Sequence, residues 1–237
     1  MNTSDSGADT LRAAISTANA DAAADEIAFA PSVTGTITLT TGAITITEDV
    51  TVTGPGSGTL AISGNNASGI FVINGNTTAN VTFTGLTFLD GSDATFGGGA
   101  IQNDNSDNVV VEDSVSTNNA ATNGTNGDGG AIESFGGTVT IRRSTFTGNT
   151  SPDDGGALAG SASAVFTIED SVFTGNVASA DGGAIRLSGN NTSTITNTTI
   201  SGNTATSNGG GIETGHAVDI TNSTISGNTS TNGDGGG

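Results

Sequence analysis

The chain alternates short apolar strands with polar corners, and this alternation itself repeats. Segments such as "VTIRRSTF" (139–146) and "FTIEDSVF" (166–173) place an apolar residue at every second position, which is typical of a β-strand with one buried face. Each segment leads into "FTGN" and then into a polar loop that ends in Asp-Gly-Gly or a close variant. A period of two residues therefore lies inside a longer period.

The longer period is close to 27 residues. The residue after the glycine pair recurs at intervals of 31, 26, 27, 27 and 26 residues. These positions are Ala100, Ala131, Ala157, Ala184, Gly211 and Gly237. A column of asparagines runs in phase with them, at Asn119, Asn149, Asn176, Asn203 and Asn228, and we expect Asn65 to belong to the same column.

A repeat of this length, with short strands and no helix, cannot bury its apolar face alone and must stack on its neighbours. We therefore predict an all-β fold, a right-handed parallel β-helix (solenoid) of about seven coils, because parallel crossovers are overwhelmingly right-handed. The predicted interior columns are Val81, Val109, Val139, Phe166 and Val218; Phe83, Val111, Ile141, Ile168, Ile195 and Ile220; and Phe88, Phe146, Phe173, Ile200 and Ile225, with Ser116 and Ser193 as polar members.

The N-terminus predicts a cap. The segment 9–32 contains the helix-like "DTLRAAISTANA", and an amphipathic helix over residues 10–20 would protect the open edge of the first coil. Its N-cap would be Asp9 or Thr10, and its buried face would carry Leu11, Ile15 and Ala18. We assign residues 1–32 to the cap, with the helix and a first strand, and 33–237 to a β-helix truncated within a repeat, whose open end could stack on another copy.

Composition restricts the partners. Four arginines against 23 acidic residues give a net charge of -19, which argues against nucleic acid and against anionic lipid surfaces. There is no cysteine for a disulfide, no apolar stretch long enough to enter a membrane, and no signal-peptide pattern in "MNTSDSGADT". The excess of carboxylates is compatible with divalent cations, a salty medium or solubility, and composition leaves the three open.

The coil register also makes an electrostatic prediction. Aligned coils place Arg142 and Arg143 between the acidic pairs 112–113 and 169–170 of the neighbouring coils. Opposite charges on adjacent strands stabilise by about 0.2–1 kcal/mol per pair. We therefore expect these two arginines to bridge coils.

The aspartates beside the glycine pairs are the candidate metal ligands. Stacked carboxylates can bind Ca²⁺ through oxygen, whereas Asp-Gly-Gly is also a turn sequence in which Asp bonds its own backbone two residues on. Both interpretations stay open, and no other cofactor is expected. The candidate ligands are Asp128, Asp153, Asp154, Asp181 and Asp234. For the asparagines we expect a structural role, at a left-handed corner with amides bonded along the stack.

Catalysis is not expected. A lyase needs a basic residue near a bound cation, but there is no lysine, Arg142 and Arg143 are assigned to charge pairs, and His216 stands alone. A glycosidase needs two carboxylates across a cleft, and no long insertion is present to wall one. A polysaccharide lyase or hydrolase fragment is kept as an alternative, because the β-helix fold alone does not exclude it.

One outward face is uncharged. The residues that flank the third interior column are hydroxyl-bearing or β-branched, as expected for a lattice that contacts a glycan, a second solenoid or ice, although β-propensity alone would also favour them. These contact-face residues are Val115, Thr117, Thr145, Thr147, Val172, Thr174, Thr199, Ser201, Thr224 and Ser226.

The repeats also resemble a known family. "GGAI" at 129–132 and 182–185, with "FTGN" at 146–149 and 173–176, resembles the repeats of chlamydial polymorphic membrane proteins. The N-terminal "DTLRAAISTANA" and "DEIAFAPSVTGTITLT" are similar to the opening of CSLREA-type secreted bacterial β-helix proteins.

The resemblance implies an extracellular or cell-surface bacterial protein whose signal and anchor are not in this chain. We expect a non-catalytic, adhesin-like stalk or binding surface with a glycan or cell-surface ligand, capable of end-to-end or lateral self-association. An ice-binding module that uses the threonine-rich face is a further alternative.

Overall fold

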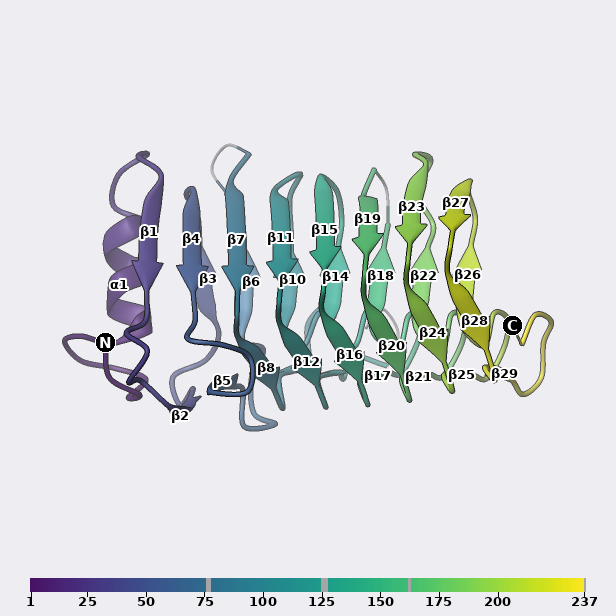
Figure 1. Cartoon of the computed structure of the whole chain (residues 1–237), viewed down its shortest axis with the longest axis horizontal. Coiled ribbons are helices and arrows are strands. Elements are labelled where there is room, and N and C mark those ends of the chain that lie inside the picture. Colours follow the sequence, from purple (N-terminus) through teal and green to yellow (C-terminus); the bar gives the residue numbers. More distant parts are fainter. Residues whose placement is uncertain (76–77, 125–127, 162, 237) are drawn as a thin grey trace.

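The computed structural model describes residues 1–75, 78–124, 128–161 and 163–236. The chain winds into a solenoid in which equivalent strands of successive coils lie side by side (Figure 1). Every pairing between the described strands is parallel, as expected when each coil returns to the position of the one before. The all-β parallel solenoid is thus confirmed, while its right-handedness stays a prediction.

The strands of the described residues form four long sheets, named here A to D. Within a coil, the chain passes through them in the order A, B, D, C. Sheet A contains β1 Asp25–Ala28, β4 Val50–Thr53, β7 Asn80–Thr84, β11 Asn108–Glu112, β15 Thr138–Arg142, β19 Val165–Glu169, β23 Ser193–Thr196 and β27 Val218–Thr221. Sheet B contains β2 Gly35–Thr38, β5 Leu60–Ser63, β8 Thr87–Leu89, β12 Val115–Thr117, β16 Thr145–Thr147, β20 Val172–Thr174, β24 Thr199–Ser201 and β28 Thr224–Ser226.

Sheets C and D complete each coil. Sheet C contains β3 Ile44–Ile46, β6 Phe71–Ile73, β10 Ile101–Asn103, β14 Ile132–Ser134, β18 Leu158–Gly160, β22 Ile185–Leu187 and β26 Ile212–Thr214. Sheet D contains the two-residue strands β9 Ser92–Asp93, β13 Ala120–Ala121, β17 Thr150–Ser151, β21 Val177–Ala178, β25 Thr204–Ala205 and β29 Thr229–Ser230. The described residues thus make about seven coils, as the sequence predicts, with β27 to β29 beginning another.

The interior columns have the predicted register. Val139 pairs with Phe166 and Ile141 with Ile168, and all four side chains are fully buried. Phe146 stacks on Phe173 with ring centroids 4.9 Å apart. Because side chains alternate along each strand, this register sends every intervening residue outward.

The polar members of the columns are also buried. Ser116 is 2% exposed, and Ser193 is fully buried with its Oγ accepting the backbone N–H of Phe166 at 3.0 Å. The apolar members on the last coil are the exceptions, since Val218 and Ile225 are only partly buried and Ile220 is 44% exposed.

The cap helix α1 runs over Leu11–Ala18, inside the range expected from the sequence. Thr10 is its N-cap, and the Thr10 Oγ1 accepts the N–H of Ala13 at 3.2 Å. Leu11, Ile15 and Ala18 form its buried face. The helix packs on β1 and β3 at the N-terminal end of the solenoid (Figure 1).

A buried carboxylate ties the segment before the helix to the first coil. Asp5 pairs with Arg12 at 2.7 Å and accepts the backbone N–H groups of Thr40 and Thr41. Burial acts to raise the pKa of Asp5, but these hydrogen bonds outweigh it and hold the pKa at about 2. Arg12 also donates to the Gly42 carbonyl at 2.6 Å, so one ion pair joins three segments.

Candidate functional site

The predicted contact face is the outer surface of sheet B. Parallel pairing aligns Val115, Thr145, Val172, Thr199 and Thr224 in one column. The second column is Thr117, Thr147, Thr174, Ser201 and Ser226. Neighbouring members of a column are one strand spacing apart, about 4.8 Å. None of the sheet B strands contains a charged residue, so the face is a regular uncharged strip on a protein of net charge -19.

The aspartates before the glycine pairs form a ladder along the solenoid axis. Asp128 Oδ1 accepts the backbone N–H of Asp154 at 3.3 Å, and Asp154 Oδ1 accepts that of Asp181 at 2.9 Å. Asp181 Oδ1 in turn accepts the N–H of Asn208 at 2.7 Å. The local turn bond expected from the sequence is therefore replaced by a bond to the next coil, because stacking brings an equivalent N–H within reach of each side chain.

Three of the five metal candidates come together. Asp128, Asp153 and Asp154 each place a carboxylate oxygen within 4.8 Å of the other two, and all three side chains are partly buried. Burial and the charges of Asp154 and Asp153 raise the pKa of Asp128 to about 6. Burial also raises the pKa of Asp154. Asp181 and the exposed Asp234 lie outside this cluster, at the later rungs of the ladder.

A fourth carboxylate next to the cluster was not predicted. Glu133 is the central residue of β14 and points outward, yet it is only 1% exposed. Its Oε2 has no hydrogen-bond partner. Burial, with the charges of Asp128 and Asp154, raises the pKa of Glu133 well above its usual range. The 27-residue alignment would have identified this residue, since it follows the Ile132 column.

The same outward column holds the counter-charge. Glu133 pairs in register with Ala159, which pairs with Arg186, and Arg186 pairs with Glu213. Arg186 Nε lies 3.2 Å from Asp154 Oδ2 and 2.6 Å from Glu213 Oε2. Arg186 therefore neutralises one side of the acidic cluster, and the small Ala159 separates it from Glu133.

The predicted hydrogen bonds of the asparagine ladder are confirmed, but the predicted left-handed conformation of the asparagines is wrong. Each Asn Oδ1 accepts both the N–H and the Nδ2 of the Asn one coil earlier, as Asn176 does for Asn149 at 3.0 Å each. The left-handed residue is the one before each Asn, such as Gly148 with φ +64. Asn65 is exposed and does not join the column, because Gly91 occupies the equivalent place below Asn119.

A second ladder, formed by serine and threonine hydroxyls, was not predicted from the sequence. At the corner between sheets A and B, each hydroxyl accepts the N–H of the equivalent residue one coil earlier and donates to the carbonyl two residues before itself. Its members are Ser114, Ser144, Ser171, Thr198 and Ser223. Their spacing equals that of the asparagines, so the same alignment carried the signal.

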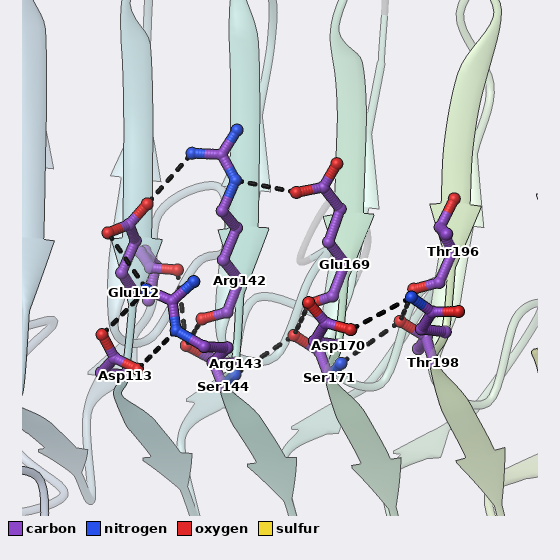
Figure 2. A network of polar contacts seen from close by, with 12 residues as sticks. Glu112, Asp113, Arg142, Arg143, Ser144, Glu169, Asp170, Ser171, Thr196 and Thr198 are labelled. Atoms are coloured by element: carbon purple, nitrogen blue, oxygen red, sulfur yellow. Dashed lines mark hydrogen bonds and ion pairs between the residues drawn. The ribbon is translucent and has the colours of Figure 1, made fainter.

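The predicted charge pairs lie beside this corner (Figure 2). Arg142 contacts Glu112 at 3.0 Å and Glu169 at 2.9 Å, so it bridges the coils on both sides. Arg143 holds both oxygens of Asp113, at 2.8 and 2.9 Å, in a left-handed backbone conformation with φ +47. The two arginines therefore bridge coils as the sequence indicates.

Ser193 and His216 are the remaining residues that resemble a reactive pair. His216 Nε2 lies 3.5 Å from Ser193 Oγ, but that oxygen already accepts the Phe166 N–H in the buried interior. His216 Nδ1 is buried and has no hydrogen-bond partner. A serine nucleophile needs an oriented base and access to substrate, and this arrangement supplies neither.

Three coils match a single family model. Residues 143–161, 170–188 and 197–215 match the Chlamydia polymorphic membrane protein (Chlamydia_PMP) repeat. Each matched segment begins at a left-handed corner residue and continues through the asparagine ladder and the glycine turn into sheet C. No curated protein and no solved structure matches the chain.

The chain is therefore similar to a family of bacterial surface proteins, which suggests an outer-surface location. Within the described ranges, no helix is long and apolar enough to span a membrane.

Proposed function

We propose that this chain is a non-catalytic, adhesin-like segment of a bacterial surface protein that acts as a rigid stalk and presents sheet B to a glycan or another cell-surface ligand. The observation that carries the proposal is the pair of straight Thr/Val/Ser columns on sheet B. Hydroxyl groups at a fixed spacing suit the repeated hydroxyls of a polymer. The similarity to the polymorphic membrane protein repeat supports the same conclusion.

The neighbouring sheet explains why sheet B is the better surface. The outward residues of sheet A include the paired charges of Glu112, Arg142 and Glu169, which already bond one another. Hydrogen-bonded charges offer little to a neutral ligand, because they would have to exchange partners to bind it. Sheet B carries no such pairs, and Val172 on it is 37% exposed.

A matched pair of double variants tests this proposal. Thr147→Lys with Thr174→Lys places two long cations in the middle of the contact face, while Thr140→Lys with Thr167→Lys makes the same change on sheet A. On a glycan array and on host-cell monolayers, we expect the first variant to lose binding and the second to retain it. Equal binding by both variants would contradict the proposal.

The alternatives give different results in the same experiment series. Thermal hysteresis that is lost in the sheet B variant would identify an ice-binding face. Release of reducing or unsaturated sugars from a polysaccharide would identify an enzyme.

We also propose that Asp128, Asp153 and Asp154 bind one Ca²⁺ ion. Oxygen ligands of Ca²⁺ lie about 2.3–2.6 Å from the ion, so oxygens up to about 4.8 Å apart can share it. The three carboxylates meet this separation, and Glu133, whose Oε2 has no hydrogen-bond partner, lies beside them. Burial and the charges of Asp154 and Asp153 raise the pKa of Asp128, and a divalent cation would offset both effects.

Calcium titration of the melting temperature tests the site. Ligand at about 100 times its Kd stabilises a protein by about 2.7 kcal/mol. We expect the wild type and the exposed-site control Asp219→Asn to gain melting temperature with Ca²⁺, and Asp153→Asn to gain none. No shift of the wild type at about 5 mM Ca²⁺, well above the Kd of extracellular calcium modules, would disprove the site.

A further inference from the structure

Two phenylalanines of the chain lie outside its core. Seven of the nine are buried, whereas Phe96 is 51% exposed and Phe135 is half-buried. The two rings meet edge to face, with centroids 5.9 Å apart and planes at 88°. Edge-to-face contact is a favourable arrangement for an aromatic pair. The pair is thus a defined surface feature that core packing does not explain.

The backbone on both sides of the pair is held in place. Phe96 lies between β9 and β10, where Asp93 Oδ1 accepts the N–H groups of residues 95–97 at 2.8–3.0 Å. Phe135 directly follows β14, and its N–H donates to the Asn103 carbonyl at 3.1 Å. The segments that carry the rings therefore need little ordering before a ligand arrives.

The rings and one carboxylate line a pocket of about 300 Å³. The third lining residue is Asp104, and Gln102 donates from Nε2 to its Oδ1. This volume lies at the lower end of the range for small-molecule sites. None of the lining side chains that the structure describes is basic.

The charge around the pocket favours a cation. Asp104 is the charged side chain among the described lining residues, and it is acidic. The whole chain carries a net charge of -19. Such a field repels anions and raises the local concentration of cations.

The ring geometry narrows the ligand further. The face of an aromatic ring is electronegative and attracts a cation, and two or more such faces form the cages that recognise quaternary ammonium groups. Perpendicular rings provide two walls of a corner, with Asp104 as a third, and no broad flat platform for a sugar ring. We infer that the pocket formed by Phe96, Phe135 and Asp104 binds a quaternary ammonium group, the chemistry of a choline head group.

Isothermal titration with choline chloride tests this inference. Its neutral isostere, 3,3-dimethylbutan-1-ol, has the same shape without the charge, and we expect choline to bind about 10-fold more tightly because of the cation–π and carboxylate contributions. Equal affinity for the two compounds would overturn the inference, as would binding of glucose in preference to choline or no binding of choline at all.

Variants locate the binding site. Phe96→Leu keeps an apolar side chain without a ring and should weaken choline binding about 5-fold or more. Asp104→Asn should weaken it by up to about 5-fold, the effect of one partly exposed charge. Val177→Leu, another exposed apolar position, is the control and should bind as the wild type does. Unchanged affinity in both pocket variants, with circular dichroism showing a folded protein, would contradict the assignment.

The choline head group could belong to a membrane lipid or to a soluble or polymer-linked compound, and two binding probes distinguish these sources. Sedimentation with phosphatidylcholine vesicles indicates a lipid, whereas binding of free choline without sedimentation indicates a soluble or polymer-linked group. The pocket lies outside sheet B, so the variant with Thr147→Lys and Thr174→Lys should still bind choline. Failure of the contact-face proposal is thereby separated from failure of this one.

Discussion

Asn176 accepts two hydrogen bonds from Asn149 at one atom, with the Asn149 N–H and Nδ2 both 3.0 Å from the Asn176 Oδ1. Both residues are fully buried. Because solvent does not reach a fully buried acceptor, this hydrogen bond is an integral part of the folded state.

Asn176→Ala should destabilise the protein by about 3 kcal/mol, because it leaves the buried N–H of Asn149 without an acceptor and also removes the bond from Asn176 Nδ2 to the Phe146 carbonyl. Chemical denaturation measures the change in the free energy of unfolding. The exposed Asn191 serves as the control, since Asn191→Ala should cost less than about 0.5 kcal/mol. Similar costs for the two substitutions would contradict the ladder.

Arg142→Glu should destabilise by about 1 kcal/mol, since it places three like charges in a row between Glu112 and Glu169. Salt at about 1 M should recover most of this loss, because it screens partly exposed charges. Comparing denaturation midpoints at low and high salt checks both statements.

Arg143→Gly should have a stability close to that of the wild type. The substitution removes an ion pair to Asp113 between half-exposed side chains, which solvent screens, but it also releases the unfavourable left-handed conformation at φ +47. A loss larger than that of Arg142→Glu in the same denaturation assay would show that the ion pair dominates.

Gly183→Ala should destabilise by more than about 3 kcal/mol, because an added Cβ would lie 2.0 Å from the Gly210 carbonyl oxygen of the next coil. Gly175 provides the matched control. Its φ is +64 and nothing lies within 4 Å of an added Cβ, so Gly175→Ala should cost only the left-handed strain, about 1 kcal/mol. Melting temperatures of the two variants give the comparison.

In metal-free buffer, the protein should be more stable near pH 5 than near pH 7.5. The pKa of Asp128 is raised to about 6 in the folded state, above its usual value of 3.8, so the folded state binds more protons between these values. The stabilisation that comes from protonating Asp128 in the folded state is complete below pH 3.8 and is lost as the pH rises through about 6. Asp128→Asn should reduce the difference in melting temperature between the two pH values, whereas the control Asp219→Asn should not. An unchanged difference in Asp128→Asn would contradict the assignment of the pH effect to Asp128.

The repeat predicted the stacking of the coils correctly, because each column takes one residue from every coil at a constant spacing in the sequence. Val139 with Phe166 and Arg142 with Glu169 follow directly from the aligned period. The left-handed corner was misplaced by one residue, from Gly148 to Asn149, because Asn is favoured both in left-handed turns and as a ladder amide.

Alignment of the repeats could not predict sites that form between segments of unlike sequence. Phe96 and Phe135 meet although neither belongs to an interior column, and their contact depends on how the loop before β10 folds over sheet C. The surroundings of Glu133 likewise include Asp128 and Asp154, which occupy other positions in the repeat. Periodicity shows which residues are equivalent, and it does not show which non-equivalent residues are close.

The two side-chain ladders run along the axis at two corners of the coil, in parallel with the hydrogen bonds of four sheets. A pulling force along the axis therefore acts on the hydrogen bonds of all four sheets and of both ladders together. Two coils separate under such a force only when all of these bonds break at nearly the same extension. A force across the axis would load one corner at a time and peel the coil open. We therefore expect the coils to separate least easily when the load is shared across the whole cross-section of the solenoid.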